Sequence, residues 1–365
     1  MSAFENQVAE ALRDPLARAR AYAERGHKVI GFVGPEIPVE LIIASGAYPV
    51  RLASAAGANT NTADRYLEST FMPEVRSIAE QYLQGALNFM HSIILPRSND
   101  SAQRLYYYLS DLRTRQFPAA PVPLIFDLAK IPRLSSQLHS RLAVRRLAAE
   151  IGAVPSALRG AIGQRNRRRE LFLRAMQMRL SRGGIRGSVM DRIFRSADLC
   201  DADEFDGDFA EWLSKPELPQ SGPRLLLIGS SPPDERLHVA VEEGGGNVVS
   251  EGDAYASRSV SSPLIPAEGS FDGIADHYHA LPVSTRAFID RAAEINSLVE
   301  SVAADGVIIW LIEEEDALIW DLPVEMAALQ LRGTATLRLV RRHWDLRDGA
   351  LEQVKSFASG LEARI

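Results

Sequence analysis

The chain has 365 residues, a formal net charge of −6 and a single cysteine, and 46% of its residues are hydrophobic. Its length exceeds one ordinary hydrophobic core, so about two domains are expected. The negative charge argues against general nucleic-acid affinity, and one cysteine excludes a disulfide framework and an all-cysteine metal site. No apolar run approaches the roughly 18 residues of a membrane span and the N-terminus has no signal-peptide core, so we expect a cytoplasmic protein that does not enter a membrane.

The first predicted unit is β-α-β. Residues 1–26 predict an amphipathic helix, and the segment KVIGFVGPEIPVELIIASGAYPVRL that follows at 28–52 contains a strand, a short helix and a second strand. The helix is expected from about Pro38 to Ala44, since proline suits a first helical turn, and Gly46 supplies the left-handed residue that ends it. The second strand enters at Pro49.

The next part of the chain predicts ligand contacts at a strand end. A helix begins at Pro73, and the strand 91–96 is followed by Ser98, Asn99 and Ser101 as turn and helix N-cap. Parallel sheets bind ligands at the carboxyl ends of their strands, so these side chains are predicted to contact a ligand. The alternative is that they only cap the following helix.

The remaining pattern predicts an α/β fold with two Rossmann-like (flavodoxin-like) parallel-sheet domains and a helical connecting region. The expected boundaries are 1–132 for the first α/β domain, 133–221 for the helical region and linker, and 222–365 for the second. Within the helical region, the basic run 165–169 indicates either a phosphate-binding patch or the solvated face of a helix.

Two polar clusters in the second half indicate chemistry. His277 and His279 would share one face of a strand and could both bind a metal, but no third ligand is identifiable, and the alternatives are a polar loop or the rim of an active site. The run 313–316 places four acids after the strand 306–312. Closely spaced carboxylates raise one another's pKa, so Glu314 is a candidate general acid or base, unless the run is simply solvated.

The segment PVELIIASGAYPVRL at 38–52 resembles the PEELILAAGAYPVRL segment of the 2-hydroxyacyl-CoA dehydratase and benzoyl-CoA reductase subunit family. The resemblance runs in order to the end of the chain and is weakest between about 135 and 215. It implies pairing of two subunits, commonly different ones, with an acyl-CoA bound in a cleft. The implied reaction is reductive removal of a 2-hydroxy group or reduction of an aromatic ring, with an ATP-dependent activator.

The chain departs from this family where the family usually carries three cysteines that hold an iron–sulfur cluster. The corresponding residues here are Met72, Asn99 and Tyr255. Neither a thioether nor an amide replaces a thiolate as a cluster ligand, and Cys200 cannot hold a cluster alone. We therefore expect no cofactor on this chain alone and a [4Fe–4S] cluster in a partner subunit.

Three functions are compatible with this departure. The first, which we favour, is a cluster-free subunit that assembles with a homologous cysteine-bearing subunit and contributes to acyl-CoA binding. The second is an acyl-CoA enzyme with redox-neutral acid/base chemistry, and the third is a ligand sensor or scaffold without catalysis. The predicted catalytic residues are Glu314, His277 and Tyr255, and the predicted ligand-binding residues are Glu40, Ser98, Asn99, Ser101 and Arg258.

Overall fold

The computed structural model describes residues 2–54, 57–129, 131–181, 184–215, 222–252, 264–266, 268–281 and 289–361. The chain divides into two compact units that alternate along the sequence. The first unit comprises Met1–Leu171, Ser196–Ala210 and Ser262–Pro282, and the second comprises Phe172–Arg195, Glu211–Ser261 and Val283–Ile365. The helices predicted between 133 and 215 are present, but they are shared between the two units.

The first unit is built on a parallel four-stranded sheet. Its strand order is β2 (Tyr48–Arg51), β1 (Val29–Phe32), β3 (Ser92–Pro96) and β4 (Val122–Phe126). The chain winds outward from β1 to β2 and then returns past β1 to β3, so the strand order reverses between β1 and β3. This is the doubly wound arrangement that the strand–helix alternation predicts.

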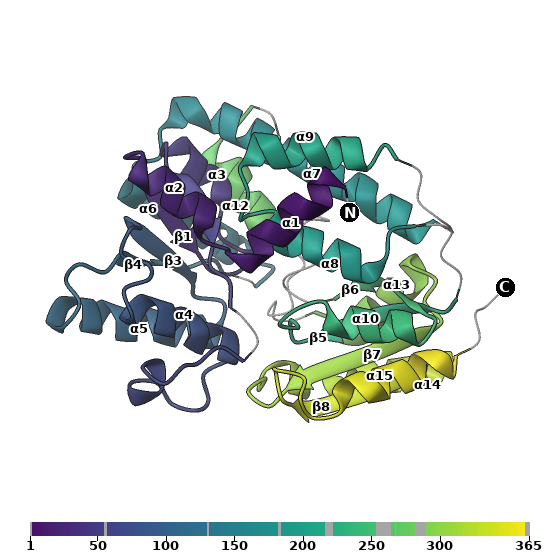
Figure 1. Cartoon of the computed structure of the whole chain (residues 1–365). Helices are drawn as coiled ribbons and strands as arrows, with labels where there is room; N and C mark the ends of the chain where they lie inside the picture. Colours follow the sequence, from purple (N-terminus) through teal and green to yellow (C-terminus); the bar gives the residue numbers. More distant parts are fainter. Residues whose placement is uncertain are drawn as a thin grey trace. The chain divides into compact units, whose positions relative to one another are not determined.

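Helices cover both faces of this sheet (Figure 1). α4 (Pro73–Leu83) and α5 (Asp100–Arg115) lie together on one face, and α3 (Val39–Ala44) and α6 (Leu134–Ile151) lie on the other. α12 (Phe271–Ala280) packs against α6. The single helix expected over 1–26 is wrong: α1 (Ala3–Arg13) and α2 (Ala17–Glu24) are separate. Pro15 breaks the helix because it disfavours the helical conformation of the residue before it.

The β1–α3–β2 unit has the predicted geometry. Leu41 and Ile42 are fully buried. Gly46 follows α3 with φ of +74°, the left-handed conformation that ends a helix at low cost only for glycine. The short helix therefore returns its apolar side to the sheet.

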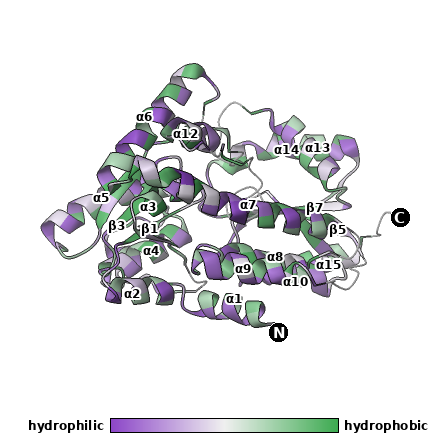
Figure 2. Cartoon of the chain, turned by 90° about the horizontal axis from the view of Figure 1, so that it is seen from above, coloured by the Kyte–Doolittle hydropathy of each residue, from purple (hydrophilic) through white to green (hydrophobic). Residues whose placement is uncertain are grey.

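The second unit has the same strand order. Its parallel sheet runs β6 (Asn247–Glu251), β5 (Arg224–Gly229), β7 (Gly306–Ile312) and β8 (Ala335–Arg342). Figure 2 shows its strands between two helix pairs, α10 (Arg236–Glu243) with α15 (Ala350–Ser359), and α13 (Arg291–Ser301) with α14 (Leu322–Arg332). Each pair buries its own apolar cluster against one face of the sheet. The predicted fold class, with two Rossmann-like parallel sheets, is confirmed.

The remaining described elements are α7 (Leu158–Leu180), α8 (Gly187–Ser196), α9 (Ala202–Trp212) and the short 3₁₀ helices η1 (Ala63–Arg65), η2 (Pro155–Ala157) and η3 (Leu318–Trp320). Among the described helices, none combines the length and the apolar character required to cross a membrane.

Candidate functional site

The carboxyl edge of the first sheet brings together a carboxylate and a hydroxyl. Glu36 follows β1 and Ser98 follows β3, and the Ser98 hydroxyl donates a hydrogen bond to the Glu36 carboxylate. Glu36 is only 5% exposed, and Ser98 is half-buried. The two residues lie at the point where the strand order reverses, which is where open α/β sheets bind ligands. This edge is therefore the candidate site of the first unit.

The first turns of α4 and α5 meet beside this pair. Asn99 is the N-cap of α5, where its side-chain oxygen accepts from the Ala102 amide at 2.9 Å. Its side-chain nitrogen lies 3.8 Å from the Met72 sulfur. The Met72 amide donates to the Ser101 hydroxyl at 3.2 Å. Asn99 and Ser101 thus have the capping and bracing roles that their residue types allow, and their contact with a ligand stays a prediction.

Met72 and Asn99, two of the positions that match cluster cysteines by resemblance, are therefore neighbours in space. A thioether and an amide do not fit an iron–sulfur cluster, which is held by thiolates. The third matching position, Tyr255, lies outside the described residues, as does Arg258. In the described parts of the chain, no three or more His, Cys, Asp or Glu side chains gather as a metal site would require.

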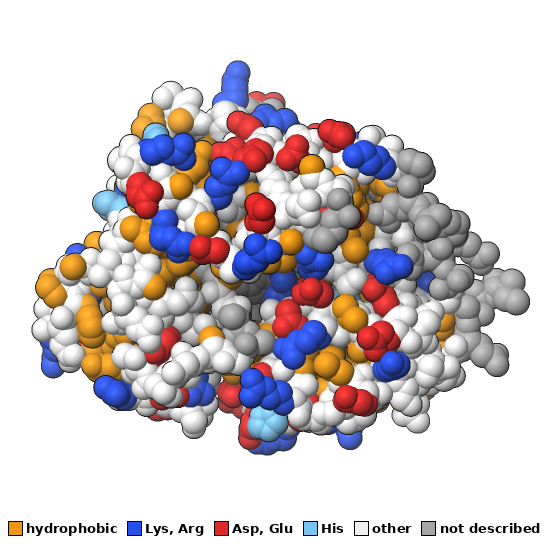
Figure 3. Space-filling view, in the orientation of Figure 1, with side chains coloured by type: hydrophobic (Ala, Val, Ile, Leu, Met, Phe, Trp, Pro, Cys, Tyr) orange, Lys and Arg blue, Asp and Glu red, His pale blue; other side chains and the backbone are white. Residues whose placement is uncertain are grey.

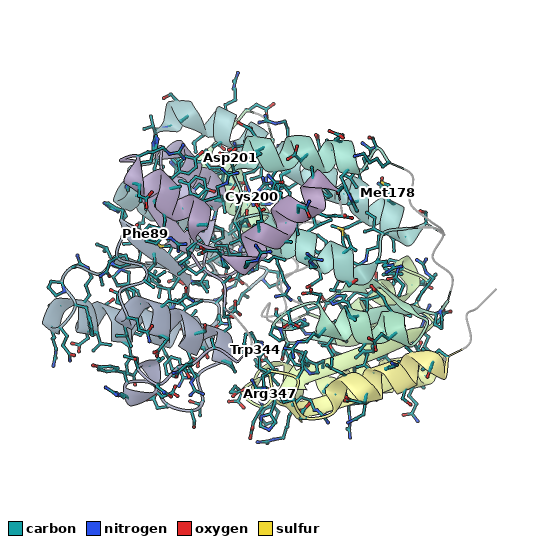
Figure 4. The ribbon with its side chains drawn as sticks, in the orientation of Figure 1. Phe89, Met178, Cys200, Asp201, Trp344 and Arg347 are labelled. Atoms are coloured by element: carbon teal, nitrogen blue, oxygen red, sulfur yellow. The ribbon has the colours of Figure 1, made fainter. Side chains whose placement is uncertain are left out.

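Cys200, the single cysteine, does not replace the missing cluster ligands. Cys200 is buried between α8 and α9, next to Asp201 (Figure 4). Burial raises the pKa of the Cys200 thiol to about 11, so it is protonated at neutral pH and is a poor metal ligand. The Asp201 carboxylate accepts a hydrogen bond from Tyr22 at 2.5 Å. The residues present therefore do not fit the family's cluster.

Glu40, on α3, is fully buried among groups that hold its charge. Arg169 donates to its carboxylate, and the Tyr278 hydroxyl donates to it at 2.8 Å. Burial alone would raise the pKa of Glu40, but the positive charges of Arg169, Arg165 and His277 lower it to about 2. Glu40 is therefore ionised at every physiological pH. Its predicted contact with a ligand stays a prediction.

The basic run 165–169 forms ion pairs inside the first unit. Arg165 pairs with Asp198 at 2.7 Å, and Arg168 pairs with Asp206 at 2.6 Å. The solvated-face interpretation is wrong for Arg168 and Arg169, which are 4% and 7% exposed. The sequence could not show this, because the acidic partners lie more than 30 residues away. On the face shown in Figure 3, basic and acidic side chains are interspersed.

His277 and His279 lie on helix α12 and not on a strand. The shared-face arrangement is therefore wrong, because helical residues two positions apart point in different directions. Ser270 fixes the helix start by accepting from the Gly273 amide at 2.9 Å. His279 is buried, with its Nδ1 3.3 Å from the Ser140 hydroxyl. His277 is half-buried and close enough to Glu40 to lower the pKa of that carboxyl.

The acidic run 313–316 forms the turn after β7 in the second unit. Glu315 is 9% exposed and accepts from the Ala317 and Leu318 amides at 3.2 Å. Burial raises the pKa of Glu315. Glu314 is half-buried, at the expected strand end, and its chemical role stays a prediction. The perturbed carboxyl of the run is thus used to cap η3.

At the carboxyl edge of the second sheet, two described polar side chains are hydrogen-bonded to backbone groups of the protein. The Trp344 indole, labelled in Figure 4, donates to the Ser231 carbonyl at 3.2 Å. Ser230 accepts from the Ile312 amide at 3.2 Å. A cavity of about 30 Å³ near this edge holds little more than one water molecule. The polar side chains in its lining are Arg291, Glu294 and Glu325.

Glu36 is the residue that the sequence analysis missed. It follows the turn Gly34-Pro35 after β1, just as Ser98 follows β3. Its place after the first strand of a β-α-β unit was the available signal.

Comparison with known proteins agrees with this architecture. The family described as "2-hydroxyglutaryl-CoA dehydratase, D-component" matches residues 36–356. The chain is also 24% identical over 328 residues to "Putative dehydratase subunit YjiM" of Escherichia coli (strain K12), and the match covers 84% of each chain. The resemblance drawn from residues 38–52 is thereby confirmed at the level of the family.

Proposed function

The chain belongs to the 2-hydroxyglutaryl-CoA dehydratase D-component family, and we propose that it is a cluster-free subunit of a dehydratase assembly. A homologous cysteine-bearing component would hold the iron–sulfur cluster of this assembly. The observation that carries the proposal is the contact between Met72 and Asn99. Two positions that correspond by resemblance to cluster cysteines lie together in space, but they carry a thioether and an amide in place of the thiolates that hold an iron–sulfur cluster.

The family and the relative support a subunit role. A D-component is one part of a multi-component dehydratase, and the matched Escherichia coli protein is described as a dehydratase subunit. Loss of cluster ligands is compatible with such a role because a partner can retain the redox chemistry. The surrounding fold is retained in both units.

The candidate site has groups suited to an acyl-CoA. The Ser98 hydroxyl, which donates its single hydrogen to Glu36 in the structure, can turn to donate to a thioester carbonyl instead, and the Glu36 carboxylate is then an acceptor for a 2-hydroxy group. The first turn of α4 begins at Pro73 and has no side-chain cap, so its backbone N–H groups favour negative charge. In this proposal the chain binds and orients part of the acyl-CoA, and the electron-transfer step belongs to the partner.

A redox-neutral enzyme is the second candidate function. The observation that favours it is the Glu36–Ser98 pair, in which a buried carboxylate accepts a hydrogen bond from a hydroxyl at the carboxyl edge of the first sheet. Such a pair can exchange a proton with a bound substrate without any metal. In this alternative the chain acts without a cluster-bearing component.

Co-purification from the native host separates the two. The chain is tagged at its genomic locus and purified without oxygen, and the co-purified chains are identified by mass spectrometry. An untagged strain is the control. The proposal expects a stoichiometric homologue with the cysteines that this chain lacks, together with iron. An iron-free preparation that contains only this chain would contradict it and favour the second candidate.

A further inference from the structure

Helix α14 and the turn before it present an apolar surface in the second unit. Trp320 is 82% exposed, Val324 50% and Leu331 90%. Within the described range 317–331, every exposed residue is uncharged: Ala317, Trp320, Pro323, Val324, Ala327, Gln330 and Leu331. Single exposed apolar side chains are normal, but a contiguous patch without charge marks an interaction site. We call Trp320, Pro323, Val324, Ala327 and Leu331 the α14 surface.

The pattern of the helix explains how this surface arises. Leu322 and Leu329 point inward and pack in the apolar cluster beneath α14. Val324, Ala327 and Leu331 follow one another at spacings of three and four residues, which places them along one stripe of α14. Trp320, at the end of η3, lies four residues before Val324 and extends this stripe. The acidic Asp321 is held by Arg291 at 2.9 Å and does not interrupt the stripe. The helix therefore has two apolar sides, and its own unit covers one of them.

We propose that the α14 surface pairs with the same surface of a second copy of this chain, with the two α14 helices antiparallel. The stripe is self-complementary about a point midway between Val324 and Ala327. A two-fold axis there brings Trp320 opposite Leu331 of the second copy and Val324 opposite Ala327. At each end of the stripe, the large Trp320 of one copy thus contacts Leu331 of the other. At the centre, the smaller Val324 and Ala327 let the two helices approach closely.

The available area agrees with a modest dimer. Allowing about 200 Å² for a large exposed aromatic side chain, the α14 surface offers on the order of 400 Å² of apolar area. A standard specific interface buries about 800 Å² on each partner, with an apolar core and a polar rim. The stripe has the size of such a core. Because this apolar area is only about half of what a standard interface buries on each partner, we expect a weak dimer, with a dissociation constant in the micromolar range.

This inference does not rest on the proposed function. Pairing through α14 joins two copies of one chain, whereas the proposed function concerns a homologous component. A dimer of the purified chain would leave the partner question open. A partner found in the host would not depend on whether the α14 surface pairs.

Sedimentation of the purified full chain tests the pairing. At chain concentrations between ~1 and ~100 µM, the wild type is expected to shift from monomer to dimer. Trp320→Glu and Leu331→Glu are each expected to weaken dimerisation about 100-fold, since each places a charge against the large apolar side chain that it contacts in the second copy. Leu142→Glu is the matched control: it charges a leucine that is 55% exposed on α6, in the other unit, and is expected to leave the dimer intact. Circular dichroism confirms that each variant is folded.

Disulfide trapping tests the antiparallel register. Val324→Cys and Ala327→Cys are prepared separately, and the native Cys200 is buried. A mixture of the two variants is expected to cross-link on mild oxidation, while each alone cross-links poorly, because a disulfide requires Cβ atoms about 4 Å apart. A wild type that stays monomeric, a Trp320→Glu variant that dimerises like the wild type, or efficient cross-linking of each variant alone would overturn the proposal.

Discussion

The two units share a framework in which a buried glutamate is paired with an arginine from α7. In the first unit Arg169 binds Glu40, and in the second Arg179 binds Glu251. Both glutamates have no exposed surface. In both, burial alone would raise the carboxyl pKa, but the arginine and its neighbours lower it to about 2. The same sheet order is thus braced by the same kind of ion pair.

The carboxyl edges of the two sheets differ. In the first unit, Glu36 and Ser98 meet at the reversal of strand order, next to Asn99. In the second unit, the Ser230 hydroxyl accepts a hydrogen bond from a backbone amide, and the Trp344 indole donates one to a backbone carbonyl. A repeated fold therefore does not repeat a site: both units have the same framework, but among the described residues their carboxyl edges carry different polar groups.

Breaking the shared framework should have the largest effect. Arg169→Met and Arg179→Met each remove the arginine that pairs with a buried carboxylate, so the free energy of unfolding should fall by about 3 to 5 kcal/mol in each case. Urea denaturation followed by circular dichroism measures this. The control is Arg145→Met: its pairing with Asp272 at 2.9 Å is solvent-exposed, and a loss below about 1 kcal/mol is expected. If Arg169→Met and Arg179→Met lowered the free energy of unfolding as little as Arg145→Met, the two buried ion pairs would not have the stabilising role proposed for them.

Changing one edge at a time sharpens the difference between the sites. Glu36→Gln should weaken binding of a 2-hydroxyacyl-CoA by about 10-fold, because a neutral amide replaces a charged acceptor. Glu315→Gln changes a buried carboxyl at the other edge and should leave affinity unchanged. Isothermal titration calorimetry of the purified chain or of its complex measures both. Equal losses in the two variants would place the ligand elsewhere.

The pH dependence should also differ between the units. Both units lose stability as the pH falls from about 4.5 towards 2. In this range Glu40 and Glu251 bind a proton in the unfolded chain but stay ionised in the folded chain, where their pKa is about 2. In the second unit His238 is hydrogen-bonded to the glutamate at 2.9 Å, whereas in the first unit His277 acts on Glu40 through its charge. Burial lowers the pKa of His238, but the charges of Asp191 and Glu251 outweigh this and raise it.

A raised histidine pKa contributes stability that is fully present below its ordinary value of 6.5 and is lost as the pH rises through the folded pKa. The melting temperature of the wild type should therefore decrease between pH 6 and pH 9. This decrease should be absent in His238→Gln. His139→Gln, at a half-buried histidine of the first unit, is the control and should keep that decrease. Identical pH profiles for the wild type and His238→Gln would show that His238 is not protonated in the folded chain.

Much of the fold could be predicted because local signals mark the ends of its elements. The strand Gly306–Ile312 and the helix that starts at Pro73 begin where they were predicted, since Gly306 and Pro73 mark these ends. His277 was misplaced because a two-residue spacing in a short polar segment does not distinguish a strand from a helix. Pro15 indicates the break between α1 and α2, but the amphipathic spacing continues across it and predicts a single helix.

The candidate site could be predicted only in part. Ser98 and Asn99 were found because they follow a strand directly, which is a local property. The partners of the buried charges were not found, because Glu40 and Arg169 are 129 residues apart and Arg179 and Glu251 are 72 apart. Tertiary structure alone brings such pairs together.

We propose that this chain holds no iron–sulfur cluster of its own. Anaerobic reconstitution of the purified chain with iron and sulfide, followed by iron analysis and visible absorption, tests it most directly. Wild type and the control Cys200→Ser are predicted to retain no stoichiometric iron after desalting, while the native complex contains it. Stoichiometric iron and sulfide on the wild-type chain alone, with the absorption of a cluster, would contradict the claim.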